Sequence, residues 1–190
     1  MHITILSSST RIDRLSHRVA LALEKMINSS SEHRATVLDL AAYQFPIMEE
    51  VLHRHPNPPE GLQDFSEQIR QSDAHLFVSP EYNGVYTAAL KNAVDYLKEG
   101  EFNKKTIGVV SVSAGALGGI RAALSMQQLV LGVSGFPIPQ MLTVPHVGKN
   151  FDQDGEILDS AFEQKMEAYL QHFLWLAEAV ADKKMATVAF

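Results

Sequence analysis

The spacing of apolar positions changes repeatedly along this chain, and the changes divide it into strands and helices. Short apolar runs, typical of buried strands, occur at 2–6, 35–40, 74–78 and 106–112. Apolar stripes at helical spacing predict helices over about 17–27, 61–71, 88–98, 120–131 and 160–181. A fifth strand is expected within 137–144, where prolines at 137, 139 and 145 obscure its extent.

This alternation of strands and helices is typical of a parallel sheet with helices on both faces. No internal repeat or change of composition divides the chain, so we predict one domain over 1–183 and a mobile tail over 184–190. The segment 41–59 contains four prolines and two histidines, and it predicts a long irregular surface loop.

Composition narrows the classes of protein that fit this pattern. The 190 residues are 46% hydrophobic with a formal net charge of −6, which suits a packed core and argues against a nucleic-acid partner. The chain has no cysteine, so redox chemistry would need a bound cofactor. The eight histidines form no metal-binding motif, and no metal site is predicted. The chain shows neither a membrane-length apolar run nor a signal peptide, so we expect no membrane partner and a cytoplasmic location.

The stretch after the third predicted strand, Ser-Pro-Glu-Tyr-Asn-Gly-Val-Tyr over 79–86, is the most unusual in the chain. Pro80 has no N–H for a sheet, so the strand should end there, and Thr87 is a candidate N-cap for the next helix. Gly84 allows a turn that presents backbone N–H groups to a planar ligand. A proline-terminated strand with surface aromatics would explain the same residues.

Two other loops are expected at the same edge of the sheet, where open α/β sheets bind ligands. The loop over 7–16 offers hydroxyl groups and Arg11, with Ser16 as a helix N-cap, and suits a phosphate. It contains neither common nucleotide-binding motif, and a merely polar turn is the alternative. The loop over 113–119 is rich in glycine and would let a ligand approach its backbone, or it is simply a flexible turn. The conjunction of three such loops favours a binding site.

These three blocks resemble the NADPH-dependent FMN reductase family, which includes chromate, quinone and azo-dye reductases. The likeness spans about 2–145 and is carried by Ser9-Thr10-Arg11 with Ser16, by 80–84 with 90–95, and by 113–119 with Arg121. It implies a three-layer α/β fold of the flavodoxin-like type, with a five-stranded parallel sheet in the order 2-1-3-4-5. Two positions depart from the family pattern, since relatives usually have glycine where this chain has Ser8 and often have proline where it has Thr87.

The resemblance also implies an FMN site. The residues around its phosphate would be Ser9, Thr10, Arg11, Ser16 and His17. Its ring would be lined by Pro80, Glu81, Tyr82, Asn83 and Gly84, and closed on the other side by Ser113 and Gly115.

The activity that the resemblance implies is hydride transfer from NADPH or NADH to the flavin, and then electron transfer to a small acceptor. Quinone, free flavin, azo dye and metal oxyanion all fit an open flavin face, and no side chain need act as acid or base. A flavodoxin-type electron carrier without NAD(P)H oxidation is the alternative, but Arg11 favours the reductase. A phospho-receiver module would have aspartate where this chain has Ser7 and Ser79.

Two further expectations concern the surface. We expect a homodimer or homotetramer, with the loop over 41–59 providing a wall for a neighbouring subunit. Arg121 could serve a nucleotide phosphate, a partner subunit or an ion pair, whereas Lys91 and Asp95 should form a surface pair at helical i, i+4 spacing.

Overall fold

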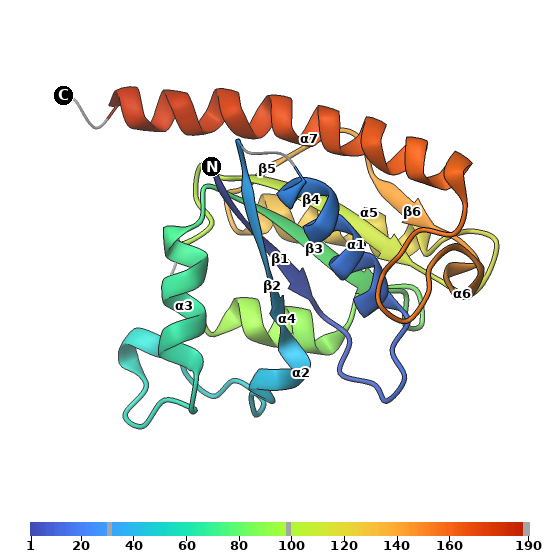
Figure 1. Ribbon diagram of the computed structural model, residues 1–190. Coiled ribbons are helices and arrows are strands. Elements are labelled where there is room, and N and C mark those ends of the chain that lie inside the picture. The colour runs from blue at the N-terminus through green and yellow to red at the C-terminus, as the bar shows by residue number, and fades with distance from the viewer. Residues whose placement is uncertain (30–31, 98–99, 188–190) are drawn as a thin grey trace.

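The computed structural model describes residues 1–29, 32–97 and 100–187. Its strands are β1 (His2–Ser7), β2 (Arg34–Asp39), β3 (Ala74–Pro80), β4 (Thr106–Val112), β5 (Phe136–Pro137) and β6 (Leu142–Val144). Its helices are α1 (Ser16–Asn28), α2 (Leu40–Tyr43), α3 (Leu62–Gln71), α4 (Ala88–Asp95), α5 (Ile120–Gly132), α6 (Val147–Asn150) and α7 (Ser160–Thr187), with a short 3-10 helix at Leu52–Arg54. Figure 1 shows how these elements are arranged. The predicted alternation of strands and helices is therefore confirmed.

The strands form one sheet in the order β2-β1-β3-β4-β5, with every pairing parallel. This confirms the predicted strand order. The position expected for a single fifth strand is filled by two short segments, because β5 pairs with the start of β4 and β6 pairs with its end. Between them the C=O of Ile138 accepts a hydrogen bond from Gln127 Nε2 at 2.8 Å, and Pro139 has no N–H to donate to β4.

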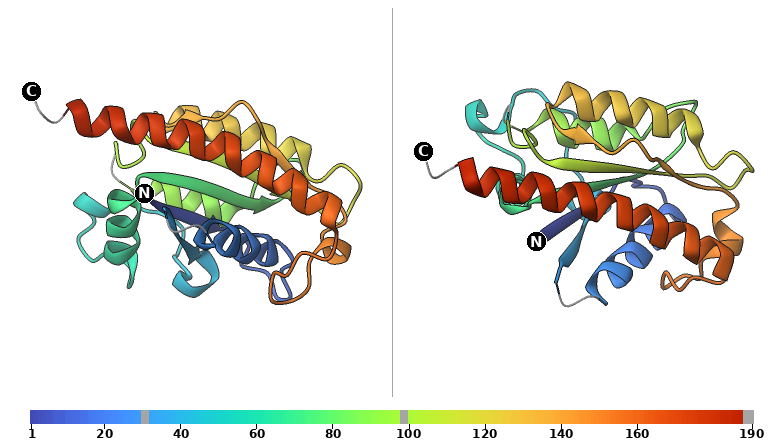
Figure 2. Two further views of the ribbon diagram at one scale, coloured as in Figure 1. Left: turned by 45° about the horizontal axis from the view of Figure 1, so that its top comes forward. Right: turned by 90° about the horizontal axis from the view of Figure 1, so that it is seen from above.

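Helices cover both faces of the sheet, as Figure 2 shows most clearly in its right-hand view. Leu76 and Val78 of β3 point toward α1 and α7, whereas Phe77 between them points toward α3, α4 and α5. This alternation follows from the two-residue period of a strand, and it divides the core into two apolar layers. Both faces are buried, which explains why β3 and β4 read as continuous apolar runs.

The C-terminal helix extends further than its predicted end at 181. It runs to Thr187, across the stretch from 184 that we expected to be a mobile tail, while 188–190 lie outside the described residues. By contrast, α4 is shorter than predicted, because it ends at Asp95. Its expected end at Lys98 lies outside the described residues. Within the described part of the chain, no helix combines the length and hydrophobicity needed to cross a bilayer.

The proline-rich segment over 41–59 packs against α4 of the same chain. Asn92 of α4 donates from Nδ2 to the C=O of Pro46 at 2.7 Å and accepts from the N–H of Met48 at 2.8 Å. Phe45 adds edge contacts with Phe65 and Tyr96, at centroid distances of 5.5 and 5.8 Å. The segment therefore has a fixed position on α4.

Candidate functional site

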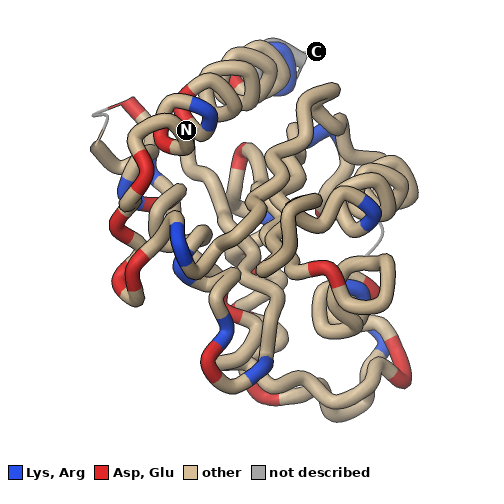
Figure 3. Tube along the Cα trace, turned by 90° about the vertical axis from the view of Figure 1, so that its right-hand side faces the viewer, with Lys and Arg blue, Asp and Glu red and all other residues tan. Residues whose placement is uncertain are grey.

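The loops after β1, β3 and β4 meet at the carboxyl edge of the sheet, as the parallel topology predicts. They surround a cavity of about 390 Å³, within the usual size of a small-ligand site. Its lining comprises Arg11, Ile12, Asp13, Arg14, Leu15, Ser16, Pro80, Glu81, Tyr82, Val112, Ser113, Ala114 and Val147. Figure 3 looks toward the side where these strands end and shows acidic and basic residues interspersed across it.

Side chains of the first two loops contact each other directly. The hydroxyl groups of Ser9 and Tyr82 are 2.9 Å apart, although 73 residues separate them in the chain. The guanidinium carbon of Arg11 lies 5.6 Å from the centre of the Tyr82 ring, at a distance typical of a cation–π contact. The predicted phosphate loop and the predicted ring loop therefore form one side of the cavity together.

Ser16 lies where the cavity meets the start of α1. We expected it to be the N-cap, but Leu15 occupies that position in a helical conformation, so Ser16 is the first residue of the helix and does not cap it. Its Oγ is buried and has no hydrogen-bond partner within the described residues. A buried hydroxyl group without a partner is costly, and a phosphate oxygen would satisfy it at the positive end of the helix dipole. These features fit the phosphate of FMN.

Arg14 lines the cavity, although no pattern in the sequence distinguishes it from Arg11. Its Nη1 donates to the C=O of Ser9 at 2.8 Å, and its two terminal nitrogens bind both carboxylate oxygens of Asp39 at the end of β2. Burial alone would raise the pKa of Asp39, but the hydrogen bonds from Arg14 and from the N–H of Ala41 outweigh it and lower that pKa. Arg14 is thus held by the protein and is not free to turn toward a ligand.

His17 contacts the end of β1. Its Nδ1 lies 2.9 Å from the hydroxyl group of Ser7, and burial, helped by the charge of Arg14, lowers its pKa. Thr10 also differs from the expectation, because it borders a separate cavity of about 460 Å³ between α2 and α4. Neither residue is among those that line the central cavity.

Asn83 and Gly84 form the tip of a tight hairpin. The N–H of Tyr82 donates to the C=O of Val85 at 2.9 Å, and the N–H of Val85 donates back at 3.2 Å. Both central residues have positive φ, +53° at Asn83 and +92° at Gly84, as a two-residue type I′ turn requires. The N–H groups of these two residues have no acceptor in the part of the chain that the structure describes, so they are available to a ligand.

Glu81 makes a contact that we did not expect for a residue beside a flavin ring. Its Oε1 accepts from Arg121 Nε at 2.9 Å, and its Oε2 accepts from the backbone N–H of Arg121 at 3.1 Å. Burial acts to raise the pKa of Glu81, but the hydrogen bonds from Arg121 and Ala122 lower it overall. The ion pair joins the ring loop to the start of α5 and is one of the three roles considered for Arg121.

The third loop is held by its own backbone. The N–H of Ser113 donates to the C=O of Val144 at 3.0 Å, and its C=O accepts from the N–H of Val147 at 3.3 Å. Its hydroxyl group accepts from the N–H of Gly115 at 2.9 Å, and Gly115 itself is exposed. Val147 follows the last strand, and no local motif marks it as a lining residue.

The structure therefore brings together part of the predicted site. Predicted residues that line the cavity are Arg11, Ser16, Pro80, Glu81, Tyr82 and Ser113. Those next to it, through contacts with lining residues or at the hairpin tip, are Ser9, Asn83, Gly84 and Gly115. Thr10 lines the separate cavity between α2 and α4, and His17 contacts Ser7.

Comparison with known proteins agrees with this geometry. The sequence pattern described as NADPH-dependent FMN reductase matches residues 1–149. A quinone reductase of Pseudomonas putida is 31% identical over 179 residues, covering 90% of both chains. An NAD(P)H-dependent FMN reductase of Pseudomonas aeruginosa is 32% identical over 123 residues, covering 62% of this chain and 66% of the relative.

Solved structures show the same fold. The flavoenzyme NAD(P)H:(acceptor) oxidoreductase FerB of Paracoccus denitrificans superimposes with a TM-score of 0.74 at 21% identity, over 95% of each chain. This likeness concerns the fold alone, which is flavodoxin-like. The match of the family pattern to most of the sequence, and the extent of the Pseudomonas putida relative, establish that the chain belongs to the NADPH-dependent FMN reductase family.

Proposed function

We propose that this chain binds FMN at the carboxyl edge of its sheet and uses it to pass electrons from NADPH or NADH to a small organic acceptor. Membership of the family makes the chain an oxidoreductase that depends on FMN and NAD(P)H. The observation that carries the location is Ser16, a residue that lines the cavity and whose buried hydroxyl group has no partner in the described chain. When bound there, FMN supplies the capacity to accept a hydride and to release electrons.

The phosphate would be held by the loop after β1. Ser16 offers its unpartnered hydroxyl group, Arg11 a guanidinium, and the first turn of α1 its unpaired N–H groups. Ser9 is buried and bonded to Tyr82, so it fixes the loop and is oriented beside the phosphate. Thr10 and His17 support this loop from outside the cavity in our proposal.

The ring would lie against the Pro80–Gly84 segment, opposite Ser113 and Gly115. The N–H groups of Asn83 and Gly84 lack acceptors in the described chain and suit the polar edge of the ring, where they would stabilise negative charge. Tyr82 offers an aromatic wall that its bond to Ser9 holds in place. No acid or base from a side chain is needed in this arrangement.

The charges at this edge bear on the class of acceptor. Among the arginines of the described loops at this edge, Arg14 is engaged by Asp39 and Arg121 by Glu81, and Arg11 is the one that we assign to the phosphate. An oxyanion such as chromate would need an uncommitted cation beside the ring, whereas a quinone would not. We therefore propose an uncharged planar acceptor, consistent with the quinone reductase of Pseudomonas putida.

The test is NADPH oxidation by the purified protein supplied with FMN, with and without a soluble benzoquinone, under nitrogen. We expect quinone-dependent loss of the NADPH absorbance and a lower kcat/KM for chromate than for the quinone. An electron carrier without reductase activity would leave the NADPH absorbance unchanged, and protein that takes up no FMN would refute the proposal.

Arg11→Ala tests the phosphate assignment. It should weaken FMN binding by roughly 1.5–3 kcal/mol, the range for a hydrogen bond to a charged group. Arg34→Ala, which removes an exposed arginine at the start of β2, is the matched control and should leave FMN binding unchanged. Equal FMN affinity in the Arg11 variant and the wild type would mean that the phosphate lies elsewhere.

We also propose a cytoplasmic location, and that the chain self-associates as a homodimer or homotetramer. The support for self-association is an apolar surface beside α5, where Val85, Leu124 and Leu131 are 51%, 52% and 64% exposed. The segment over 41–59 is bound to α4 of its own chain, so α5 is the better candidate for the contact. Sedimentation at micromolar concentration should show a species larger than the monomer, and Leu124→Glu should shift it toward the monomer.

A further inference from the structure

We infer that Arg14 and Asp39 form a clamp that positions the phosphate loop, so that the affinity for FMN depends on an ion pair outside the phosphate's own contacts. The inference rests on the proposed FMN site and adds two positioning residues to it. Neither residue belongs to the set selected from the sequence.

The clamp joins the end of β2 to the loop that follows β1, its neighbour in the sheet. Asp39 ends β2, the edge strand of the sheet, and its Oδ1 accepts from the N–H of Ala41 at 3.0 Å as the N-cap of α2. Arg14 lies in the loop between β1 and α1, and it binds both oxygens of that carboxylate. A bidentate pair of this kind fixes orientation as well as distance.

The same guanidinium fixes the backbone of the loop. Nη1 of Arg14 also donates to the C=O of Ser9 at 2.8 Å. This carbonyl lies two residues before Arg11 and within the turn that must surround a phosphate. From the opposite side, the Ser9 hydroxyl group is held by Tyr82 at 2.9 Å. The loop is thus held on one flank by the edge strand and on the other by the ring loop.

Burial makes this pair more than a surface contact. The side chains of Arg14 and Asp39 are 18% and 24% exposed, so solvent screens them only partly. Ion pairs such as Lys91–Asp95, at 50% and 38% exposure, are typical of surface pairs with little effect. A partly buried pair at the base of a binding loop can pre-organise that loop for its ligand.

A direct role for Arg14 in binding the phosphate predicts the opposite sign for one substitution. If Arg14 touched the phosphate, Asp39→Asn would release the guanidinium and remove a negative charge near an anion, and FMN would bind at least as tightly. If the pair acts as a clamp, the same substitution loosens the loop and FMN binds more weakly. The introduced amide would retain an oxygen for the Ala41 N–H, so the N-cap of α2 is preserved.

The experiment measures dissociation constants of FMN and of riboflavin, which lacks the phosphate, by quenching of flavin fluorescence. The proteins are wild type, Asp39→Asn, Arg14→Met and the double variant. Arg18→Met is the control, because Arg18 lies within the first turn of α1 and donates to the C=O of Phe151 instead of to the loop. Circular dichroism and thermal unfolding of each variant establish that it is folded.

We expect Asp39→Asn and Arg14→Met each to raise the FMN dissociation constant by about tenfold, in line with the effect of removing an outer-shell partner. The riboflavin constant should change by less than about twofold, and the double variant should be no worse than either single variant. Arg18→Met should bind FMN like the wild type.

Three results would overturn the clamp while leaving the FMN site intact. One is tighter or unchanged FMN binding by Asp39→Asn. Another is equal weakening of FMN and riboflavin, which would indicate a general loss of structure. The third is an additive double variant. Failure of the wild type to bind FMN would instead refute the proposed function. Asp39→Asn alone distinguishes the two roles, so the test remains decisive even if Arg14→Met does not fold.

Discussion

The hydroxyl groups of Ser8 and Thr87 lie 2.9 Å apart in the buried space between the loop after β1 and the start of α4. Thr87 also contacts the C=O of Ser8 at 3.0 Å and accepts from the N–H of Leu90 at 3.2 Å. These are the two positions that we expected from the sequence to depart from the family pattern. The structure shows that their side chains are partners, because the hydroxyl group at one position binds the hydroxyl group at the other.

A double-mutant cycle on Ser8→Ala and Thr87→Val tests this relationship. Each single variant should lose about 1 kcal/mol of unfolding free energy, somewhat more for Thr87→Val because the N-cap of α4 is lost with it. The double variant should lose less than the sum, with a coupling of about 0.5–1 kcal/mol. Urea unfolding gives these values. Combining Thr87→Val with Ser29→Ala, at the distant end of α1, should be additive, and additivity in the Ser8 pair would contradict the contact.

Gly84→Val should impair FMN binding more than Asn83→Ala does. Both residues have positive φ. Alanine in place of Asn83 adds only modest backbone strain, whereas a β-branched valine in place of Gly84, at φ +92°, is strongly disfavoured. The valine side chain would also extend toward the guanidinium of Arg121, 3.7 Å from the position of a Cβ atom. We expect at least a tenfold difference in FMN dissociation constant, about 1.4 kcal/mol. The reverse order would show that the Asn83 side chain, and not the backbone, contacts the flavin.

His75 makes the protein sensitive to acid. Both of its ring nitrogens are buried without partners in the described chain, and the ring packs edge-on against Phe102 at 5.2 Å. Burial, with a smaller contribution from Lys105, places its pKa well below the ordinary value. The unfolded chain takes up a proton near pH 6.5 and the folded chain does not, so the unfolding free energy falls as the pH drops below about 6.5.

Replacing His75 by leucine should remove this dependence. Between about pH 6 and 5 the wild type should lose roughly 1.4 kcal/mol per pH unit more than the variant, down to the folded-state pKa of His75. Urea unfolding at several pH values measures the slope. His172→Gln, on the exposed face of α7, should keep the slope of the wild type. Parallel slopes for His75→Leu and the wild type would show that His75 is protonated in the folded protein.

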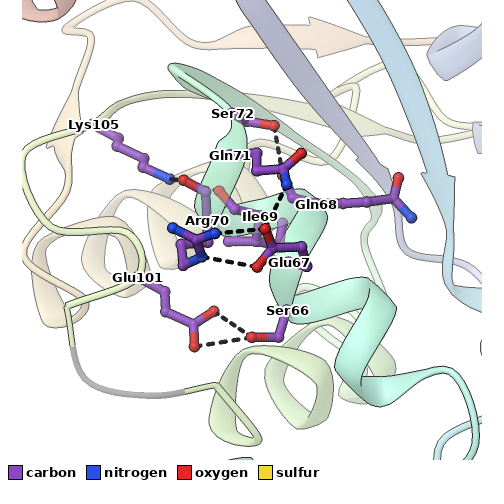
Figure 4. A network of polar contacts seen from close by, with 9 residues as sticks. All are labelled: Ser66, Glu67, Gln68, Ile69, Arg70, Gln71, Ser72, Glu101 and Lys105. Carbon is purple, nitrogen blue, oxygen red and sulfur yellow. Dashed lines mark hydrogen bonds and ion pairs between the residues drawn. The ribbon is translucent and has the colours of Figure 1, made fainter.

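Lys105 makes the unfolding free energy depend on pH in the alkaline range. Its Nζ is buried and donates to the C=O groups of Ile69 and Arg70 at 2.5 and 3.0 Å, at the end of α3, as Figure 4 shows. Burial is the main cause that lowers the pKa of Lys105 to about 8. Between about pH 8 and 10.4 the unfolded chain holds a proton that the folded chain has released, so this residue makes stability rise with pH.

Lys105→Met should abolish that rise, which amounts to as much as ~3 kcal/mol across the interval. The measurement is the difference in unfolding free energy between the wild type and the variant at pH 7.5 and at pH 10. Lys104→Met, the exposed neighbour, leaves every other titrating group in place and should follow the wild type. A difference between wild type and Lys105→Met that does not change with pH would mean that Lys105 titrates normally.

Local sequence determined the first four strands, the order in which the long helices follow them, and the positions of the three loops. Apolar runs and helical stripes result from burial on two faces or on one, and they are visible within a window of about ten residues. Thr87 caps α4 as expected, and Lys91 binds Asp95 at 2.6 Å, because both contacts lie within one helical turn. The tight turn at Asn83–Gly84 likewise follows from the residues that tolerate positive φ.

Only the tertiary structure decided which charged and polar groups are committed to each other. Arg11 and Arg14 are equivalent as cations of one loop, yet Asp39 engages one of them from a strand 25 residues away. Glu81 binds Arg121 across 40 residues, Ser8 binds Thr87 across 79, and Ser16 lost its expected capping role when the helix began one residue earlier. The physical reason is that a polar side chain takes the nearest available partner in space, and proximity between distant segments is set by the register and winding of the sheet.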